Sequence, residues 1–492
     1  MSNIENPHKM KDEQNKESYR CYATVSADGI LIKEVLCKIF LPIKIVEPVL
    51  IHFHPTEEQL RMMEGVWKFS MECEFYPSPD HLTKIYADKV YTRRSSTQFW
   101  HPDISERIVI ARPEGLRIET QRNVGDEPPL ENSHGRYWLT PSKLLSPAQT
   151  IMHSFTGEVE VKTVWQISFT LNSGIPLMFG NRYRYRENAE GETIIYSELV
   201  ADFAMEGGEQ FMQRVKNGLH ELDDLLLLTS FAERQRCLNL GYDTSEIDGT
   251  LREYYRANVA IPEFRDNSNN LLIEQADIQE FLNTAYKQFK SIEAIDLVRQ
   301  AINYVIPSKG ETIQSIFISL YSALETIVLY LRRQANLEFI FSEEEAEKWK
   351  TFKGNLRKFI EQHPLLENDK TKQTLLKKNL SALQRISFAT AYESGLKYLS
   401  LNMADLWPVI DRGEEWSLSD IRNKLVHGDY LNQSQLHSVV FATEHIRWIV
   451  ERLILTVLGW NIERSNVCAD YLRHMNAYNQ WKAERLLLNE DK

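Results

Sequence analysis

The sequence lacks the short motifs that mark the common enzyme classes. It has no G-x-G-x-x-G and no G-x-x-x-x-G-K-[ST] segment, so folds that hold nucleotide phosphates in a glycine-rich loop lose support. A G-x-S-x-G nucleophile elbow and an H-E-x-x-H zinc motif are absent as well. Any chemistry must therefore be carried by a less common residue pattern.

Cysteine is scarce, and long apolar runs are missing. The five cysteines are an odd number, lie far apart and form no C-x-x-C pair, which argues against a disulfide framework or a structural zinc site and favours a reducing cytosol. No uninterrupted apolar run reaches the roughly 18–20 residues of a membrane helix, and the polar N-terminus does not resemble a signal peptide. We therefore expect a cytoplasmic protein that has no membrane partner.

The composition is that of an ordinary globular chain, but its charge is unevenly distributed. Of 492 residues, 43% are apolar and 26% charged, which suits two to four domains. The net charge is −12, of which residues 1–275 carry −11 and residues 276–492 carry −1. Because an acidic chain does not coat nucleic acid indiscriminately, an RNA site should be local and lie in the C-terminal half.

The hydrophobic period changes along the chain from two to about 3.6. We predict a disordered tail at residues 1–18, a β-rich N-terminal domain with a helical connector at 19–270, and an all-α domain at 271–492. The fold class is therefore α+β and multidomain, with a sandwich or barrel-like β module followed by a helical bundle. The clearest predicted elements are strands at 35–40, 49–54, 108–111, 159–171 and 193–203, and helices at 277–305, 312–333, 418–427 and 434–458.

Two patterns in the β-rich half are candidate binding sites. His52 and His54 alternate on a predicted strand just before Glu57 and Glu58, which makes a metal site conceivable, but no third ligand is identified and two half-buried histidines are the simpler interpretation. We therefore predict no metal and no cofactor.

The second pattern is the alternating segment Arg182-Tyr-Arg184-Tyr-Arg186. Its three guanidinium groups would line one face of a strand and could bind a polyanion. They could equally form a solvated face whose tyrosines pack inward.

The most informative segment is Ser417-Leu-Ser-Asp-Ile-Arg422-Asn423-Lys-Leu-Val-His427-Gly428. An arginine followed by histidine after four to six residues occurs four times in the chain, so the spacing alone has little weight. Only this copy has asparagine after the arginine. It also has the frame of a short helix, with a capping-box-like start at Ser417 and a glycine stop.

A helical wheel separates the polar residues of this segment. Leu418, Ile421 and Leu425 share one side and should pack inward, whereas Asn423 and His427 are i,i+4 neighbours on the opposite side. Arg422 lies about 140° from His427 on an ideal helix. Either the helix opens near Gly428 or a second copy of the chain completes the site, which points weakly to a dimer.

The Arg-Asn-x-x-x-His pattern in a C-terminal all-α domain resembles the HEPN superfamily over roughly residues 276–460, and the helix containing Ser322-Ala-Leu-Glu325 is similar to its Apea-like branch. The β-rich N-terminal module resembles, in architecture only, bacterial abortive-infection proteins of the ApeA type. The resemblance implies a metal-independent ribonuclease that acts as a homodimer, with Arg422 and His427 as the catalytic pair and Asn423 as the polar residue beside them.

The sequence leaves two functions open. In the first, the helical domain cleaves RNA, tRNA being one candidate, and the acidic N-terminal module restrains it until a phage-derived trigger arrives. In the second, the chain is a non-catalytic binding or scaffold protein that senses a phage or RNA ligand. The sequence does not decide whether Glu325 supports the site by positioning Arg422.

Overall fold

The structure is a computed structural model, and it divides the chain into two compact units, residues 1–266 and 267–492. It describes residues 18–27, 29–42, 47–63, 66, 68–78, 81–101, 104–122, 131–153, 159–187, 193–208, 210–256, 271–306, 310–335, 339–341, 343–366, 369–411, 413, 415–428 and 431–488.

The first unit contains a closed ring of six strands. The order is β6-β3-β2-β1-β4-β5, and β5 pairs back with β6 along most of its length. The strands are β1 (Ser18–Ala27), β2 (Ile30–Phe40), β3 (Leu50–His54), β4 (Lys68–Ser78), β5 (His81–His101) and β6 (Ile104–Arg122), and the short helix α2 (Glu57–Met63) follows β3. Val35, Cys37 and Ile39 of β2 are fully buried at every second position, so the ring encloses a hydrophobic core.

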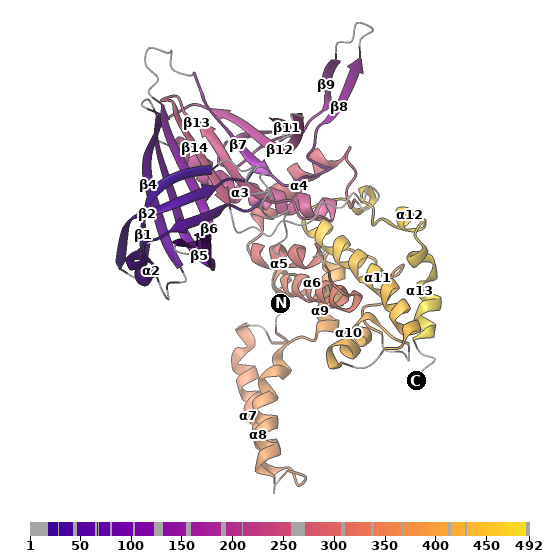
Figure 1. The fold of residues 1–492 in the computed structure, drawn as a ribbon. Helices are drawn as coiled ribbons and strands as arrows, with labels where there is room; N and C mark the ends of the chain where they lie inside the picture. The colour runs from indigo at the N-terminus through magenta and orange to yellow at the C-terminus, as the bar shows by residue number, and fades with distance from the viewer. Residues whose placement is uncertain are drawn as a thin grey trace. The chain divides into compact units, whose positions relative to one another are not determined.

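The sheet continues beyond the ring because β6 has two partners on one edge. Its first part pairs with β3 and its last part with β14. The outer strands are, in order, β14 (Thr250–Arg256), β13 (Asn239–Ser245), β7 (Ser133–Leu139), β12 (Thr193–Met205), β11 (Pro176–Glu187) and β10 (Ser168–Thr170). Two further strands, β8 (Ala148–His153) and β9 (Val159–Trp165), form a separate hairpin (Figure 1).

The helix α3 (Phe211–Glu233) packs against the outer part of this sheet. The Tyr137 hydroxyl on β7 donates to the Val215 carbonyl at 2.9 Å. A Cβ atom at Gly218 would lie 2.5 Å from the same hydroxyl oxygen, so the glycine allows the helix to approach the sheet closely. This contact joins residues that are 78 positions apart in the chain.

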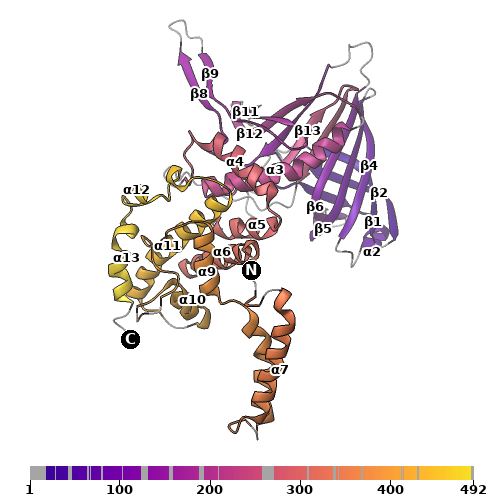
Figure 2. The ribbon, with the colours of Figure 1, turned by 180° about the vertical axis from the view of Figure 1, so that it is seen from behind.

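The second unit is helical. Its elements are α4 (Ile278–Ser291), α5 (Ile295–Val305), α6 (Ile313–Gln334), η1 (Glu343–Glu345), α7 (Ala346–Gln362), α8 (Lys370–Asn379), η2 (Leu380–Gln384), α9 (Phe388–Tyr398), α10 (Leu418–His427), α11 (Gln433–Val457), η3 (Ile462–Arg464), α12 (Ala469–Leu472) and α13 (Asn476–Leu487). The helix α6 packs against α5, α9, α10 and α11, and α11 also packs against α13 (Figure 2).

The predicted arrangement of a β-rich N-terminal half and a helical C-terminal half is confirmed. The predicted strands at 35–40, 49–54, 108–111 and 193–203 lie in β2, β3, β6 and β12. The segment 159–171 is not one strand, because it is divided between β9 and β10, which belong to different sheets. The predicted tail at 1–18 lies outside the described residues except for Ser18, which begins β1.

One helix prediction is wrong. The segment 277–305 forms two helices, because Ile292 takes an extended backbone conformation (φ −76°, ψ 121°) and ends α4. No proline or glycine marks this break in the sequence. Ile292 is itself buried, so tertiary packing rather than local propensity determines where α4 ends.

Among the described residues, α6 is long and apolar enough to cross a membrane when judged by length and composition alone, with a mean hydropathy of 1.4. Its sequence contains no uninterrupted apolar run of that length, because polar residues interrupt the helix. Leu324, Ile327 and Leu331 of α6 are buried within the unit. A core helix passes the same test, so this property is weak support for a membrane segment.

The core of the helical unit contains a titratable group, His445 on α11. Its Nδ1 atom accepts a hydrogen bond from the Trp407 backbone N–H at 3.1 Å, and its Nε2 atom lies 3.0 Å from the Ala477 carbonyl. A neutral ring that carries its proton on Nε2 satisfies both contacts. Burial lowers the pKa of His445 from 6.5 to about 4.

We predict that this group destabilises the helical unit in acid. The unfolded chain binds a proton near pH 6.5 and the folded chain only near pH 4, so the free energy of unfolding should fall as the pH is lowered through this window, by about 3 kcal/mol in total. Chemical denaturation of wild type and His445→Asn at several pH values between 7 and 4 measures this fall in the free energy of unfolding. An equally steep decline in the variant would contradict the assignment.

Candidate active site on the Arg–His helix

Local sequence determines both ends of α10. The Ser417 hydroxyl oxygen accepts a hydrogen bond from the Asp420 backbone N–H, and the Asp420 carboxylate accepts one from the Ser417 backbone N–H at 2.9 Å, which completes a capping box. At the other end Gly428 has φ 74°, in the left-handed region that glycine adopts without strain. The helix therefore spans Leu418–His427, the predicted range.

The apolar side of α10 packs inward as the wheel predicts. Leu418 and Ile421 are fully buried, and Leu425 is half-buried. The Ser419 hydroxyl donates to the Val409 carbonyl at 2.7 Å and lies 2.7 Å from the Tyr321 hydroxyl on α6. These contacts hold α10 against α6 and fix the direction in which the polar side of α10 faces.

Arg422 is held by residues of α6. Its Nη2 atom lies 3.5 Å from a carboxylate oxygen of Glu325, and its guanidinium carbon lies 5.7 Å from the centre of the Tyr321 ring. Its Nη1 atom also donates to the Asn423 side-chain oxygen at 3.3 Å. Because Tyr321 and Glu325 are one helical turn apart, both reach the same arginine. About a third of the Arg422 side chain stays accessible, which leaves room for an anionic ligand.

His427 and Asn423 lie on the exposed side of α10. Within the described part of the chain, no hydrogen bond or ion pair joins His427 to Arg422, and the helix is continuous between them. The helix is regular from Leu418 to His427 and ends at Gly428, so it does not open between the two residues. A single copy of the chain presents Arg422 and His427 in directions about 140° apart, with Asn423 between them on the wheel.

Sequence reasoning missed Tyr321 as part of this arrangement. Burial raises the pKa of its hydroxyl, so it remains neutral at physiological pH. Its spacing of four from Glu325 was the available signal, since the two side chains share one face of α6. The Tyr321 ring also lies 5.9 Å from the Phe388 ring on α9, which anchors it in the core.

The histidine pair for which a metal site is conceivable, His52 and His54, lies on β3. His52 is buried on β3, with its ring packed edge-on against Phe40 at 4.6 Å. His54 is half-buried at the end of the same strand, and Glu57 and Glu58 begin α2. Across the described ranges, no group of three histidine, cysteine, aspartate or glutamate side chains is placed to hold a metal ion.

The arginine-rich segment lies on β11, where it pairs with β12. The Arg182 guanidinium lies 3.4 Å from Asp243, and Arg136 lies 3.1 Å from the same carboxylate. Arg182 is therefore engaged in an ion pair rather than held open for a polyanion. The side chains of Arg184 and Arg186 lie outside the described residues.

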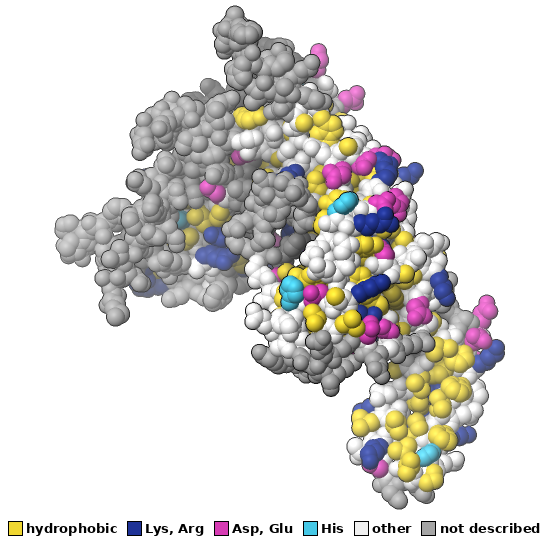
Figure 3. Space-filling view, turned by 90° about the vertical axis from the view of Figure 1, so that its right-hand side faces the viewer, with side chains coloured by type: hydrophobic (Ala, Val, Ile, Leu, Met, Phe, Trp, Pro, Cys, Tyr) yellow, Lys and Arg dark blue, Asp and Glu magenta, His cyan; other side chains and the backbone are white. Residues whose placement is uncertain are grey.

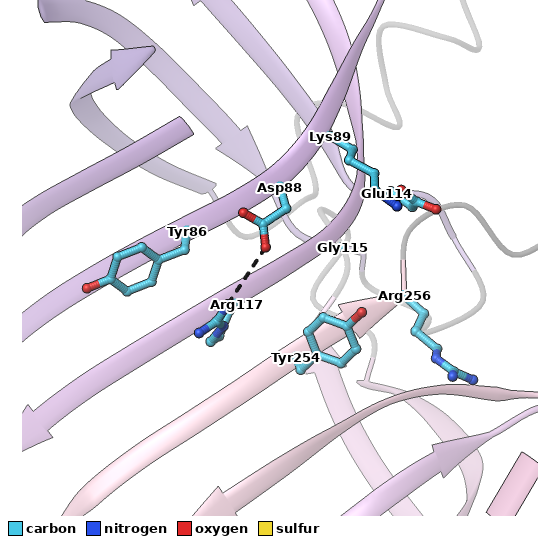
Figure 4. A pocket seen from close by; sticks show the side chains of 8 residues that line it. All are labelled: Tyr86, Asp88, Lys89, Glu114, Gly115, Arg117, Tyr254 and Arg256. Carbon is cyan, nitrogen blue, oxygen red and sulfur yellow. Dashed lines mark ion pairs between the residues drawn. The ribbon is translucent and has the colours of Figure 1, made fainter. Parts of the chain in front are cut away.

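A hollow of about 480 Å³ lies where β5, β6 and β14 pair (Figure 4). Gly115 makes room for it, since a Cβ atom there would lie 2.8 Å from the Tyr254 hydroxyl oxygen. Each cation at the edge of this hollow has an acidic partner. Lys89 lies 2.8 Å from Glu114, and Arg117 lies 3.8 Å from Asp88. Arg256 binds Asp223 through two contacts of 2.7 and 2.8 Å. The hollow therefore offers no surplus positive charge to a phosphate.

No family model, curated protein or solved structure matches this chain.

The capping box yields a first prediction for the site. Replacing Ser417 by alanine removes its hydroxyl contacts with Asp420 at the start of α10 and should lower the free energy of unfolding by about 1 kcal/mol. Urea denaturation followed by circular dichroism measures the change. The exposed Thr371→Ala on α8 is the control and should have little effect; an equal loss in both variants would remove the special role of Ser417.

Proposed function

We propose that this chain is a metal-independent endoribonuclease effector of bacterial anti-phage abortive infection, cytoplasmic and active as a homodimer of HEPN-type helical domains. The observation that carries the proposal is α10, a helix with both ends capped that exposes Asn423 and His427 and keeps Arg422 partly accessible on its flank. The hold of Glu325 and Tyr321 on Arg422 supports it, because a phosphate-binding arginine acts best when it is oriented in advance.

RNA cleavage needs little more than these residue types. The nucleophile is the 2′-hydroxyl of the substrate itself, and an imidazole can take its proton or donate one to the leaving 5′-oxygen, an effect of about 10²–10⁴-fold. A guanidinium stays charged and binds two phosphate oxygens at once. The products would be a 2′,3′-cyclic phosphate and a 5′-hydroxyl, and no step requires a metal.

The separation of Arg422 from His427 supports the dimer. On one continuous helix the two side chains cannot act on the same phosphate. If the α10 helices of two copies face each other, Arg422 of one copy can bind a phosphate of the RNA. His427 of the other copy can then take the proton of the 2′-hydroxyl or donate one to the leaving oxygen. The Asn423 side-chain oxygen already accepts a hydrogen bond from Arg422, which leaves its amide N–H groups for the phosphate.

We predict that His427→Ala abolishes RNA cleavage without unfolding the protein. Loss of the acid–base group should reduce the cleavage rate by at least about 10²-fold. Purified wild type and variant are incubated with total RNA and with tRNA in EDTA, and the new ends are tested for cyclic phosphate. The exposed His474→Ala, in the same unit, serves as the matched control and should cleave like wild type.

The same pair of variants separates the two functions. If wild type protects bacteria from phage and His427→Ala protects equally well, catalysis at α10 is dismissed. The chain would then be pursued as a non-catalytic binding protein, for which changes in Arg182, Arg184 and Arg186 should be damaging. RNA cleavage that stops in EDTA would contradict the metal-independent mechanism.

The charge distribution suggests how the nuclease is restrained. Residues 1–275 carry a net charge of −11 and would repel RNA near the helical unit until a phage-derived trigger binds. We predict that deletion of residues 1–270 raises toxicity in growing bacteria. The same deletion combined with His427→Ala is the control and should be harmless. Unchanged or lower toxicity of a deletion protein that is helical by circular dichroism would count against the restraint.

A further inference from the structure

The helices α7 and α8 form an antiparallel hairpin within the helical unit. Lys353 donates to the Ser381 hydroxyl at 2.6 Å, and Lys377 lies 2.7 Å from Glu361. In an antiparallel hairpin the numbers of two residues at the same height add up to a constant, which these two contacts place at roughly 736. Trp349, Ile360 and Leu380 are buried, and the Trp349 ring lies 5.4 Å from Phe341 and 6.0 Å from Phe352. Both views of the ribbon show the hairpin extending away from the other helices of the unit (Figures 1 and 2).

One side of this hairpin carries two apolar rungs, each made of one phenylalanine from α7 and one leucine from α8 or η2. Phe352 and Leu383 are level with each other and 48% and 56% exposed, and Phe359 and Leu376 are level and 62% and 43% exposed. Phe352 and Phe359 are seven residues apart in α7 and therefore share one side of that helix. Leu376 lies in α8, and Leu383 lies in η2, which follows α8 directly. The space-filling view shows hydrophobic side chains gathered on this hairpin (Figure 3).

The α7–α8 hairpin is basic. Residues 346–379 contain nine lysines and arginines but only four acidic residues, in a chain with a net charge of −12. On the helical wheels Arg357, Lys370 and Lys378 lie on the side away from the rungs. Lys348 and Lys372 flank the rungs, and each is paired with an acidic residue of its own hairpin, Glu345 at 3.1 Å and Asp369 at 3.2 Å. Two such apolar faces can therefore meet without bringing unpaired like charges together.

We propose that the apolar rungs of the α7–α8 hairpin bind the same rungs of a second copy of this chain. A two-fold axis parallel to the hairpin places α7 of each copy over α8 of the other, so every neighbouring helix is antiparallel, as in an up-and-down four-helix bundle. In both rungs a phenylalanine then meets a leucine of the other copy. A surface with this pattern is complementary to itself, which is the requirement for a symmetric dimer.

The burial of large side chains makes this contact favourable. Each apolar side chain that becomes fully buried contributes about 1.5–3 kcal/mol. The axis also places both helical units at the same end of the four-helix bundle. The proposed function requires two copies of the chain to be in contact, and the apolar rungs provide that contact. In this respect the inference rests on the proposed function.

Light scattering after size-exclusion chromatography of the full chain tests the proposal. Wild type should have about twice the mass of the 57.5 kDa chain, and Phe359→Ser/Leu376→Gln should have half the mass of wild type. The matched control is Leu375→Gln, which changes an exposed leucine next to Leu376 that points about 100° away and should leave the dimer intact. Equal helicity by circular dichroism shows that the variants are folded.

A charge-pair experiment gives a second, independent readout. Phe359→Lys and Leu376→Glu should each be monomeric alone, because each buries a charge in the contact. An equimolar mixture should regain dimer, since the new lysine of one copy faces the new glutamate of the other. Two monomeric variants that do not recover dimer on mixing would overturn the proposed pairing of α7 with α8.

Three further outcomes are decisive. A wild-type monomer at about 100 μM, or a rung variant that remains dimeric, overturns the inference. Binding of wild type to phosphatidylcholine–phosphatidylserine vesicles that the rung variant loses assigns the face to a membrane and also overturns it. RNA cleavage is measured on the same samples: a rung variant that is monomeric while wild type cleaves no RNA supports this inference and rejects the proposed nuclease.

Discussion

The position of the candidate site depends on one backbone carbonyl, that of Trp416. It accepts hydrogen bonds from the Trp407 indole N–H at 2.9 Å and from Nε of Arg485 at 2.8 Å. Both donors are buried, where hydrogen bonds are strong and costly to lose. The next residue, Ser417, begins α10, so the core determines where the helix starts and in which direction it runs.

Arg485 connects this carbonyl to the rest of the helical unit. It lies on α13 and also binds Asp411 and Glu415, two acidic residues of the segment that leads to α10. Trp407 is in turn bound through its backbone N–H to His445 on α11. Residues from α11, α13 and the segment before α10 therefore meet at one point, and α6 holds the other side of α10 through Tyr321.

This rigidity has a chemical consequence. A short helix that could bend would bring an arginine and a histidine five positions apart to one ligand, but a helix capped at both ends cannot. The same constraint that orients Arg422 toward Glu325 directs His427 elsewhere, so the proposed reaction needs a second copy of the chain. The apolar rungs on α7 and α8 offer a surface for that copy that is separate from the reacting groups.

Short-range features could be derived from residue order. The capping residues of α10, its inward side at Leu418 and Ile421, and the change from β-rich to helical structure follow from contacts within a few residues of each other, where backbone geometry leaves few options. Contacts between distant segments could not be derived. The pairing of β5 with β6 that closes the ring, the break at Ile292, and the approach of Glu325 to Arg422 across 97 positions depend on packing between elements whose separation in the chain carries no local signal.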